Sequence, residues 1–448
     1  MSADPAELRD SLSGDVLTSP DREYERARLC FNLLIDRRPA LIARCADADD
    51  VATALAFGQE KGLEIAVRGG GHNPAGHCAV DAGLVIDLSR MRNVEVDPEN
   101  GIAVSEGGTT WLDFDAATQA HGLVTPGGVV GSTGVTGLTL GGGIGHLTAQ
   151  HGLTCDNLLS AELVTPGGER VRASAAENPE LLWGLRGGGG NFGVVTRTEF
   201  RLHRLERVVG GRLDYEGDAV REALRAFRDV DRHAGDEISI QCQISTQEDL
   251  TPTLVVVPSY TGPDEETEEI RALRSVPGLV NDGVREQSFL DQQRIFDPGY
   301  GVDRNYWKGH FVRELPDELI DLLVDRMSAL GRPPGAILIE SLRGAPKDFD
   351  PDGAALGYRD AAFNLSVMAS WIDPAADDEH IAWVRETAAA IEPWSVRGGY
   401  ANYMQADEPL ERVRGAFGPD NFARLQALKS QYDPENLLHR NQNIPPAG

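Results

Sequence analysis

Apolar and polar residues along the first 90 positions form a pattern that predicts a strand, a helix and further strands. Short apolar runs at 39–44, 63–67 and 83–88 lie close to Gly, Pro or Asp, which is typical of buried strands. Between the first two runs, residues 49–61 carry apolar side chains at helical spacing and predict an amphipathic helix. We expect a small α/β subdomain here.

The next unit, from about Val94 to His203, differs because glycine-dense connections separate its strand-like runs. Glycine weakens helix and strand interiors, so the connections at 127–145 and 186–193 are too rich in glycine to form either. The strand-like runs lie at 102–105, 161–165 and 194–200.

Glycine thins out after about Val208, and the pattern there predicts an α+β layer that shapes a pocket. In the last 50 residues Gly, Asn and Tyr return, and we expect this tail to pack back on the first domain. The helix-like segments are 218–234, 264–275, 316–330 and 377–391, and strand-like runs lie at 238–244 and 254–258.

The composition indicates a folded protein of enzyme size. Its 448 residues suffice for two or three domain-sized units, and 41 % of them are apolar. A net charge of -28, from 42 basic and 70 acidic residues, repels nucleic acid and anionic membranes, so we exclude both as partners. The acidic residues are scattered, which favours a well-solvated surface, with salt adaptation as the alternative.

The cysteines and the N-terminus predict a cytoplasmic location. Five cysteines stand at wide, irregular spacings, without the close pairs of a disulfide framework or a thiolate zinc site. Residues 1–36 lack a basic start followed by an apolar core, and no run of about 18 apolar residues occurs. We therefore expect neither secretion nor a membrane span.

Three glycine clusters, at 69–71, 127–145 and 187–193, carry the candidate chemistry. A backbone without Cβ atoms can approach a flat ligand, and its N–H groups can surround a pyrophosphate. The clusters predict either an extended nucleotide cofactor or tight strand crossings. Gly188–Gly193 satisfies the fingerprint G-x-G-x-x-G, but a helix precedes it and a strand follows, so we exclude a Rossmann site.

His72 stands where the first cluster ends, and it is either an attachment site or a hydrogen-bonded structural histidine. His77 and Cys78 lie near it, yet no histidines have zinc-ligand spacing, so we predict no metal. The chain contains neither a Gly-x-Ser-x-Gly nucleophile elbow nor the phosphate-binding loop of NTPases. Acyl transfer and NTP hydrolysis therefore lack their usual motifs.

Aromatic residues cluster late in the chain, and most of them should lie in the core. Trp383 sits in a helical pattern that argues for this. Tyr400 and Asn402 follow Gly398 and Gly399 on a loop, where a phenol and an amide are either aimed at a ligand or structural.

Together these motifs resemble those of the FAD-linked oxidases with the vanillyl-alcohol-oxidase (PCMH-type) fold, in the berberine-bridge-enzyme-like branch. The resemblance covers nearly the whole chain. It implies an α+β protein, with a two-subdomain FAD-binding domain and a substrate domain built on an antiparallel sheet. The matching segments are 40–44, 50–52, 67–73, 83–89, 125–128, 140–145, 152–157, 182–196, 399–403 and 433–446.

The resemblance further implies an FAD joined through its 8α-methyl group to an imidazole nitrogen of His72. This attachment needs the neutral ring, and we expect the charge of Arg68 to favour that form. A covalent link also raises the flavin potential, which suits oxidation of C–N and C–O bonds. Members with a second covalent bond carry a cysteine at about the place of Val130, so we predict attachment through histidine alone.

By the same resemblance, Tyr400 and Asn402 are the catalytic residues beside the isoalloxazine ring. Tyr400 would take a proton from a substrate OH or NH, which requires that a nearby cation or the oxidised flavin lowers its pKa. Lys308 is a candidate for that cation, with a structural role as the alternative.

The remaining cofactor residues are also implied by the resemblance. Thr133 and Leu138 would control the access of oxygen, and Asp156, Asn157 and Val195 would lie near the ADP half. The pyrophosphate and flavin would be lined by Gly69, Gly70, Gly71, Gly131, Ser132, Thr133 and Gly137, with further contacts from Arg68, Asn73, Gly141, Gly142, Gly193, Asn441 and Asn443.

The implied organisation is an FAD-binding domain over 1–205, a substrate-binding domain over 206–395 and a C-terminal segment, 396–448, that returns to the first domain. The implied reaction is hydride removal from a carbon bearing OH or NH, with O2 as acceptor and H2O2 as product. An alkaloid-like amine, a sugar-like alcohol or a secondary-metabolite intermediate would be the small-molecule substrate. The alternatives are a flavin dehydrogenase with another acceptor and a flavin-binding protein without turnover.

Overall fold

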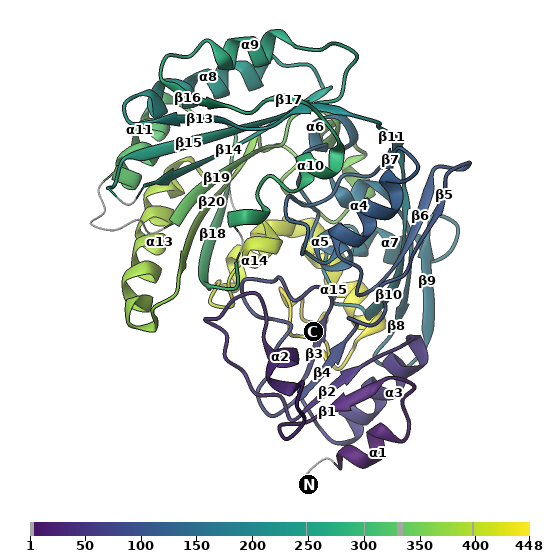
Figure 1. The fold of residues 1–448 in the computed structure, drawn as a ribbon. Coiled ribbons are helices and arrows are strands. Elements are labelled where there is room, and N and C mark those ends of the chain that lie inside the picture. Colours follow the sequence, from purple (N-terminus) through teal and green to yellow (C-terminus); the bar gives the residue numbers. More distant parts are fainter. Residues whose placement is uncertain (1–3, 248, 300, 329–334, 397) are drawn as a thin grey trace.

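The protein combines helices with several β-sheets, and its α+β class is as predicted (Figure 1). The structure is a computed structural model that describes residues 4–247, 249–299, 301–328, 335–396 and 398–448. Two smaller sheets from the first half of the chain lie below and beside one large antiparallel sheet (Figure 1).

The first sheet, with strand order β1-β2-β4-β3, positions the loop that carries His72. Its elements are α1 (Pro5–Arg9), β1 (Asp15–Leu17), α2 (Tyr24–Arg28), β2 (Leu41–Arg44), α3 (Ala48–Glu60), β3 (Ile65–Arg68) and β4 (Leu84–Asp87). β4 pairs in parallel with both β2 and β3, and α3 provides the crossover. The Asp47 side chain caps α3 by accepting hydrogen bonds from the backbone N–H groups of Asp49 and Asp50. This confirms the predicted strands and helix.

The second sheet is antiparallel, with strand order β5-β6-β10-β8-β9. This region contains β5 (Val94–Asp97), β6 (Ile102–Glu106), α4 (Trp111–Gln119), β7 (Leu123–Val124), α5 (Val135–Leu140), α6 (Thr148–His151), β8 (Leu158–Val164), β9 (Arg170–Ser174), α7 (Pro179–Leu185), β10 (Val194–Arg201) and β11 (His203–Arg204). The prediction that 127–145 holds no helix is wrong, because α5 forms there with Gly137 inside it. Val135 and Leu140 pack in the same core as Trp111, and this packing outweighs the low helix propensity of glycine.

The large sheet runs in the order β16-β13-β15-β14-β19-β20-β18, and β12 pairs with β15 and β17 beside it. Its elements are β12 (Val208–Gly210), β13 (Leu213–Glu216), α8 (Ala219–His233), β14 (Ile238–Thr246), β15 (Pro252–Tyr260), α9 (Glu268–Arg274), β16 (Leu279–Asp282), β17 (Arg285–Gln287), α10 (Phe289–Gln293), β18 (Arg304–Val312), α11 (Asp317–Ser328), β19 (Gly335–Ser341), α12 (Ala345–Asp348), β20 (Phe363–Trp371) and α13 (Asp377–Ile391). The predicted helices and strands of this part are confirmed, although Leu330, the expected end of one helix, lies outside the described residues.

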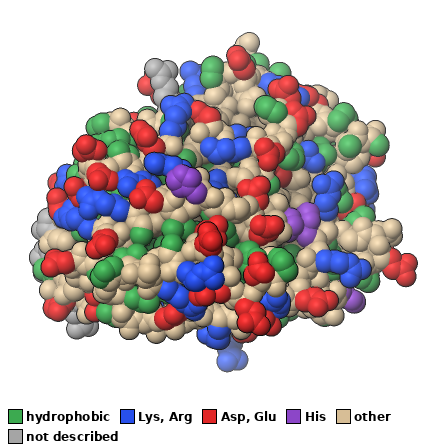
Figure 2. Space-filling view, turned by 90° about the horizontal axis from the view of Figure 1, so that it is seen from above, with side chains coloured by type: hydrophobic (Ala, Val, Ile, Leu, Met, Phe, Trp, Pro, Cys, Tyr) green, Lys and Arg blue, Asp and Glu red, His purple; other side chains and the backbone are tan. Residues whose placement is uncertain are grey.

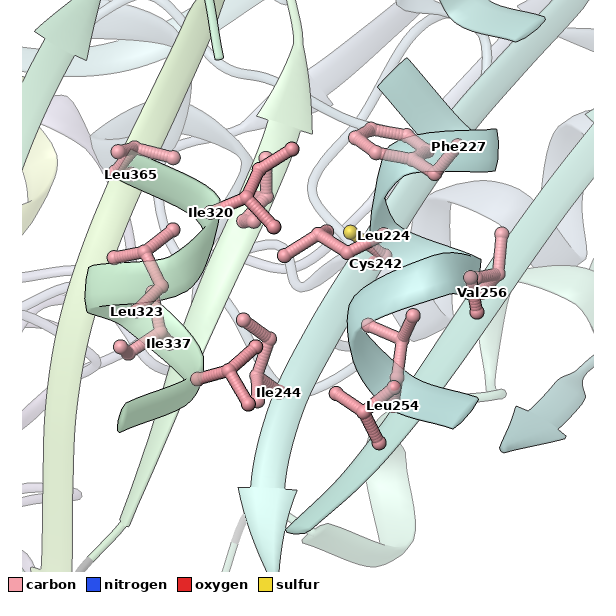
Figure 3. Packing of buried hydrophobic residues seen from close by; sticks show 14 of the residues in the cluster. Leu224, Phe227, Cys242, Ile244, Leu254, Val256, Ile320, Leu323, Ile337 and Leu365 are labelled. Carbon is pink, nitrogen blue, oxygen red and sulfur yellow. The ribbon is translucent and has the colours of Figure 1, made fainter. Parts of the chain in front are cut away.

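The two faces of the large sheet differ in chemistry. On one face, Cys242 and Ile244 of β14 pack with Leu224 and Phe227 of α8 (Figure 3). Successive side chains of a strand point to opposite sides, so the residues between them in β14, among them Gln241, belong to the other face. That second face is turned toward the glycine-rich loops, since Val257 of β15 packs there against Val129 and Val130.

The C-terminal segment contains α14 (Leu410–Phe417) and α15 (Pro419–Tyr432) and lies against the third glycine cluster. Nζ of Lys429 donates to the carbonyl oxygen of Asn191 at 2.8 Å, and the backbone N–H of Ile444 donates to Oδ1 of Asn191 at 3.1 Å. The domain limits at 205 and 395 stay predictions.

Acidic and basic side chains are interspersed on the face seen in Figure 2. Many charged side chains of the described residues form ion pairs, for example Arg92 with Asp113 and Arg274 with Asp282. Within the described part of the chain, no helix combines the length and the apolar character that a membrane span needs.

Candidate functional site

The three glycine clusters meet around a cavity of about 1640 Å³, part of which is open to solvent. They come from the loop after β3, from the segment around α5 and from the loop after α7. The clusters thus gather around a common space, as a large ligand requires. The lining glycines are Gly69, Gly70, Gly71, Gly107, Gly128, Gly134, Gly137, Gly141, Gly187, Gly188, Gly189, Gly190 and Gly193.

Two kinds of glycine shape this cavity. A Cβ added to Gly70 would lie 2.3 Å from the backbone nitrogen of Gly134, so the first two clusters touch backbone to backbone. A Cβ added to Gly137 or Gly190 would meet no protein atom within 4 Å. These two positions open into the cavity, where any larger residue would occupy ligand space.

His72 lies in the wall of this cavity, and its imidazole is neutral. Nε2 stands 2.9 Å from the hydroxyl oxygen of Ser132, and the ring stacks on Phe31 with centroids 4.3 Å apart. Burial lowers the pKa of His72 to about 4. The neutral ring is as expected, but the expected cause, the charge of Arg68, is wrong, because burial lowers the pKa of His72. The Arg68 guanidinium instead donates a hydrogen bond to the carbonyl oxygen of Ala27.

Several buried polar atoms of the cavity wall have no hydrogen-bond partner among the described residues. They are Nε2 of His77, Oγ1 of Thr136, Nε of Arg440 and Oδ1 of Asn441. An unpaired buried polar atom costs about 1–3 kcal/mol, so these atoms indicate a ligand with polar groups.

Tyr400 lies just behind the cavity wall. Its hydroxyl oxygen accepts hydrogen bonds from the backbone N–H of Gly143 at 2.8 Å and from Nδ2 of Asn402 at 2.9 Å. Burial raises the pKa of Tyr400 well above its ordinary value, and the charge of Glu340 adds to the rise. The expected lowering of this pKa by a cation is therefore wrong, while its lowering by oxidised flavin stays a prediction. Nζ of Lys308 instead forms ion pairs with Glu408 at 2.7 Å and Asp407 at 3.2 Å, as its structural alternative proposes.

Glu340 of β19 is a titratable group that the sequence analysis missed. It is fully buried, and its carboxylate accepts hydrogen bonds from the Tyr403 hydroxyl at 3.3 Å and from Nδ2 of Asn364 at 2.6 Å. Burial raises the pKa of Glu340 to about 7, against the effect of these two hydrogen bonds. The available signal was an acidic residue inside an apolar run, at 336–342.

Amide side chains flank Glu340 on both neighbouring strands. Gln241 of β14 and Asn364 of β20 stand directly opposite it in the sheet. Both amide atoms of Gln241 and Oδ1 of Asn364 are buried without a hydrogen-bond partner in the described part of the structure. This row lies on the sheet face turned to the loops, and it presents unsatisfied polar atoms there.

A second cavity, of about 910 Å³, adjoins the first, because Trp307 lines both. Its wall combines rings and apolar side chains with neutral amides and hydroxyls, a mixture typical of small-molecule sites. The charged member of the wall, Arg212, is paired with Asp214. The lining residues are Phe31, Arg212, Gln243, Ser245, Val255, Ile295, Phe296, Pro298, Gly299, Gly301, Asn305, Trp307, Gly335, Ala336, Met368 and Ser370.

The chain is similar to proteins of one family over almost its whole length. Residues 39–174 match an FAD binding domain, and residues 399–445 match the berberine and berberine-like family. (R)-6-hydroxynicotine oxidase of Paenarthrobacter nicotinovorans is 30 % identical over 465 residues, covering 98 % of each chain. The crystal structure of 6-hydroxy-D-nicotine oxidase from Arthrobacter nicotinovorans has a TM-score of 0.90 at 28 % identity, covering 98 % of this chain and 99 % of that one.

The chain belongs to the berberine-bridge-enzyme-like FAD-linked oxidoreductases. A xylooligosaccharide oxidase from Myceliophthora thermophila shares the fold, with a TM-score of 0.86 at 24 % identity over 99 % of each chain. The family assignment and the PCMH-type fold are thus as predicted.

The cavity of this FAD-linked oxidoreductase fits FAD. The glycines in its wall let a flat ligand lie against the backbone. Its unpaired polar atoms suit a ligand with phosphate groups and ring heteroatoms. Of the residues predicted to contact FAD or the substrate, those that line the cavity are Gly69, Gly70, Gly71, His72, Asn73, Thr133, Gly137, Leu138, Gly141, Gly193, Val195, Asn402 and Asn441.

Other predicted residues of the site do not line the cavity. Asp156 is engaged instead in an ion pair with Arg359, and Asn157 bonds the backbone of His151 and the ring of His203. The backbone N–H of Gly131 donates to Asp297 at 2.8 Å. The predicted site residues that do not line the cavity are Arg68, Gly131, Ser132, Gly142, Asp156, Asn157, Tyr400 and Asn443.

Proposed function

We propose that this enzyme is an oxidase that removes hydride from a C–OH or C–N carbon of a small molecule, with FAD attached to His72 and O2 as the acceptor that yields H2O2. The position of Glu340 carries the proposal. This buried carboxylate, whose pKa is about 7, is bonded to Tyr403, and Tyr403 lines the cofactor cavity. When bound, FAD supplies the hydride acceptor and the route of the electrons to O2.

The protein's part is to take up the proton. Glu340 lines neither cavity, so its ionised form accepts the proton of the substrate OH or NH through the Tyr403 hydroxyl as the hydride leaves, and the substrate ends as a neutral carbonyl or imine. The Tyr403 hydroxyl, 3.3 Å from Glu340, orients the carboxylate. Tyr400, the residue first expected to act as base, keeps its proton and fixes Asn402 at the cavity wall.

The second cavity is the proposed substrate site. Its rings and neutral amides suit a ring-bearing alkaloid-like amine, a sugar-like alcohol or a secondary-metabolite intermediate. Relatives named for 6-hydroxynicotine and for xylooligosaccharides support both the amine and the alcohol. Thr133 and Leu138, in the lining of the first cavity, are proposed to control the approach of O2.

Two measurements test the function. After acid precipitation, yellow colour should stay in the pellet, and a yellow supernatant over a colourless pellet would disprove covalent attachment. Anaerobic addition of (R)-6-hydroxynicotine, xylobiose and a panel of related amines and alcohols should bleach the flavin absorbance, which should return at once in air. Slow return would indicate a dehydrogenase, and no bleaching would indicate a protein without turnover.

A further inference from the structure

Two side chains hold the imidazole of His72 from different sides. The ring of Phe31 covers one face, with centroids 4.3 Å apart and planes 13° apart. The hydroxyl oxygen of Ser132 stands 2.9 Å from Nε2. Nδ1 makes no hydrogen bond among the described residues, and His72 lines the cofactor cavity.

Phe31 is itself held on two sides. Its backbone N–H donates to the carbonyl oxygen of Gly71 at 3.1 Å, and its ring meets Trp307 edge-on at 5.5 Å. The next residue, Asn32, is fully buried, and its Nδ2 donates to the carbonyl oxygens of Pro74 at 2.7 Å and Asn305 at 2.8 Å. The ring of Phe31 is therefore fixed both to the loop that carries His72 and to β18.

We propose that Phe31 and Ser132 are positioning residues that fix the His72 ring for attachment of FAD. This proposal rests on the proposed covalent link. With Nε2–H donating to Ser132, the lone pair of Nδ1 is free toward the cavity. A ring that could turn about its χ2 angle would present this lone pair only part of the time, and the stacking on Phe31 removes that freedom.

The atoms and electrons of the attachment reaction balance with His72, FAD and O2 alone. A C–N bond forms between the imidazole and the 8α-methyl carbon, while one C–H bond and the imidazole N–H bond break. The proton leaves from Nε2, where Ser132 accepts the hydrogen bond. Two electrons and two protons reside on the reduced ring system until O2 takes them up as H2O2.

The test measures attachment rather than turnover. Flavin-free protein is mixed with FAD in air, and the flavin retained in the acid pellet is followed over time for the wild type, Phe31→Leu, Phe31→Tyr, Ser132→Ala and Ser132→Thr. We expect attachment about tenfold slower in Phe31→Leu and Ser132→Ala, and rates near the wild type in Phe31→Tyr and Ser132→Thr, which keep the ring and the hydroxyl.

Matched controls are Phe363→Leu in the core of the large sheet and Ser105→Ala, whose hydroxyl bonds Thr198. Both should attach FAD at the wild-type rate, and thermal midpoints of all variants show whether each one folds. Attachment rates within twofold of the wild-type rate in both Phe31→Leu and Ser132→Ala would overturn the positioning role and leave the covalent link in place. A wild type without any covalent flavin would overturn it together with the covalent link, while hydride transfer is judged separately by anaerobic bleaching.

Discussion

The hydroxyl of Tyr403 lies 3.3 Å from Oε1 of Glu340, and this contact joins the large sheet to the cofactor cavity. The Tyr403 ring also stands edge-on to Trp307 at 5.4 Å, and Trp307 lines both cavities. Glu340 itself lines neither cavity, so the Tyr403 hydroxyl is the contact through which a proton from the cofactor cavity would reach its carboxylate.

Replacing Glu340 by Gln should remove the proton acceptor. Because the carboxylate is the active form and its pKa is about 7, the wild-type rate of anaerobic flavin reduction should rise as the pH increases through about 7 and then level off. We expect Glu340→Gln to be about 10²–10⁴-fold slower and to lack this step. Stopped-flow reduction between pH 5.5 and 9 measures both, and a wild-type profile without the step would contradict the assignment.

Glu340→Gln should slow the reaction but raise the free energy of unfolding at high pH. A carboxyl whose pKa rises from 4.5 to about 7 on folding loses stability as the pH rises through that interval, because ionisation then favours the unfolded chain. Glu340→Gln should therefore be more stable than the wild type at pH 8, by up to about 3 kcal/mol, and similar at pH 4.5. Urea unfolding at the two pH values checks this; equal differences at both would disagree with a raised pKa.

Tyr400→Phe should act differently from Glu340→Gln. The phenol is held protonated by burial, so its loss should leave the pH profile of flavin reduction in place. The backbone N–H of Gly143 loses its acceptor, and Nδ2 of Asn402 keeps only the carbonyl oxygen of Leu138. We expect a loss of about 1–3 kcal/mol in stability and a modestly slower reduction. A vanished pH step in Tyr400→Phe would instead make Tyr400 the base.

The parts of the site that could be predicted from the sequence are those that local chain features determine. His72 and its glycines form one contiguous segment, and Tyr400 and Asn402 form another, so each motif was visible without the fold. Glu340 was not, because its burial depends on β14 and β20 closing over it with Gln241 and Asn364. The raised pKa of Glu340 therefore depends on the packing of three strands that are separated in the sequence.

The helix α5 was missed for a related reason. Its sequence, with Gly137 inside, has low helix propensity, and the packing of Val135 and Leu140 beside Trp111 stabilises it. The ion pair of Asp156 could not be predicted either, because its partner Arg359 lies about two hundred positions further along the chain. Contacts over such separations leave no local pattern.

His72 should attach FAD over a wide pH range. Because burial holds its pKa at about 4, nearly all of the imidazole is neutral above about pH 5, and the attachment rate should fall only below that value. Mixing flavin-free protein with FAD from pH 4.5 to 8 and assaying the acid pellet gives the profile. His72→Ala should release all flavin into the supernatant, and a rate that climbs through pH 6–7 would mean an ordinary, exposed imidazole.

Lys429 and Asp433 form a buried ion pair that ties the C-terminal segment to the third glycine cluster. Nζ of Lys429 donates to Asp433 at 2.6 Å and to the carbonyl oxygens of Asn191 and Leu438 at 2.8 and 3.0 Å, and both charged side chains are fully buried. Lys429→Met leaves the Asp433 carboxylate without its cation, at a cost of about 3–5 kcal/mol.

Because Leu438 and Asn441 line the cofactor cavity, this loss should also weaken non-covalent FAD binding. In a His72→Ala background, where FAD binds without a bond, Lys429→Met should raise the dissociation constant of FAD at least about tenfold, a coupling of about 1.4 kcal/mol. Fluorescence titration with FAD and thermal unfolding measure the two effects. Lys347→Met, at an exposed lysine, serves as the control and should change neither. Unchanged FAD affinity in Lys429→Met would show that the tail is held in place by its apolar contacts alone.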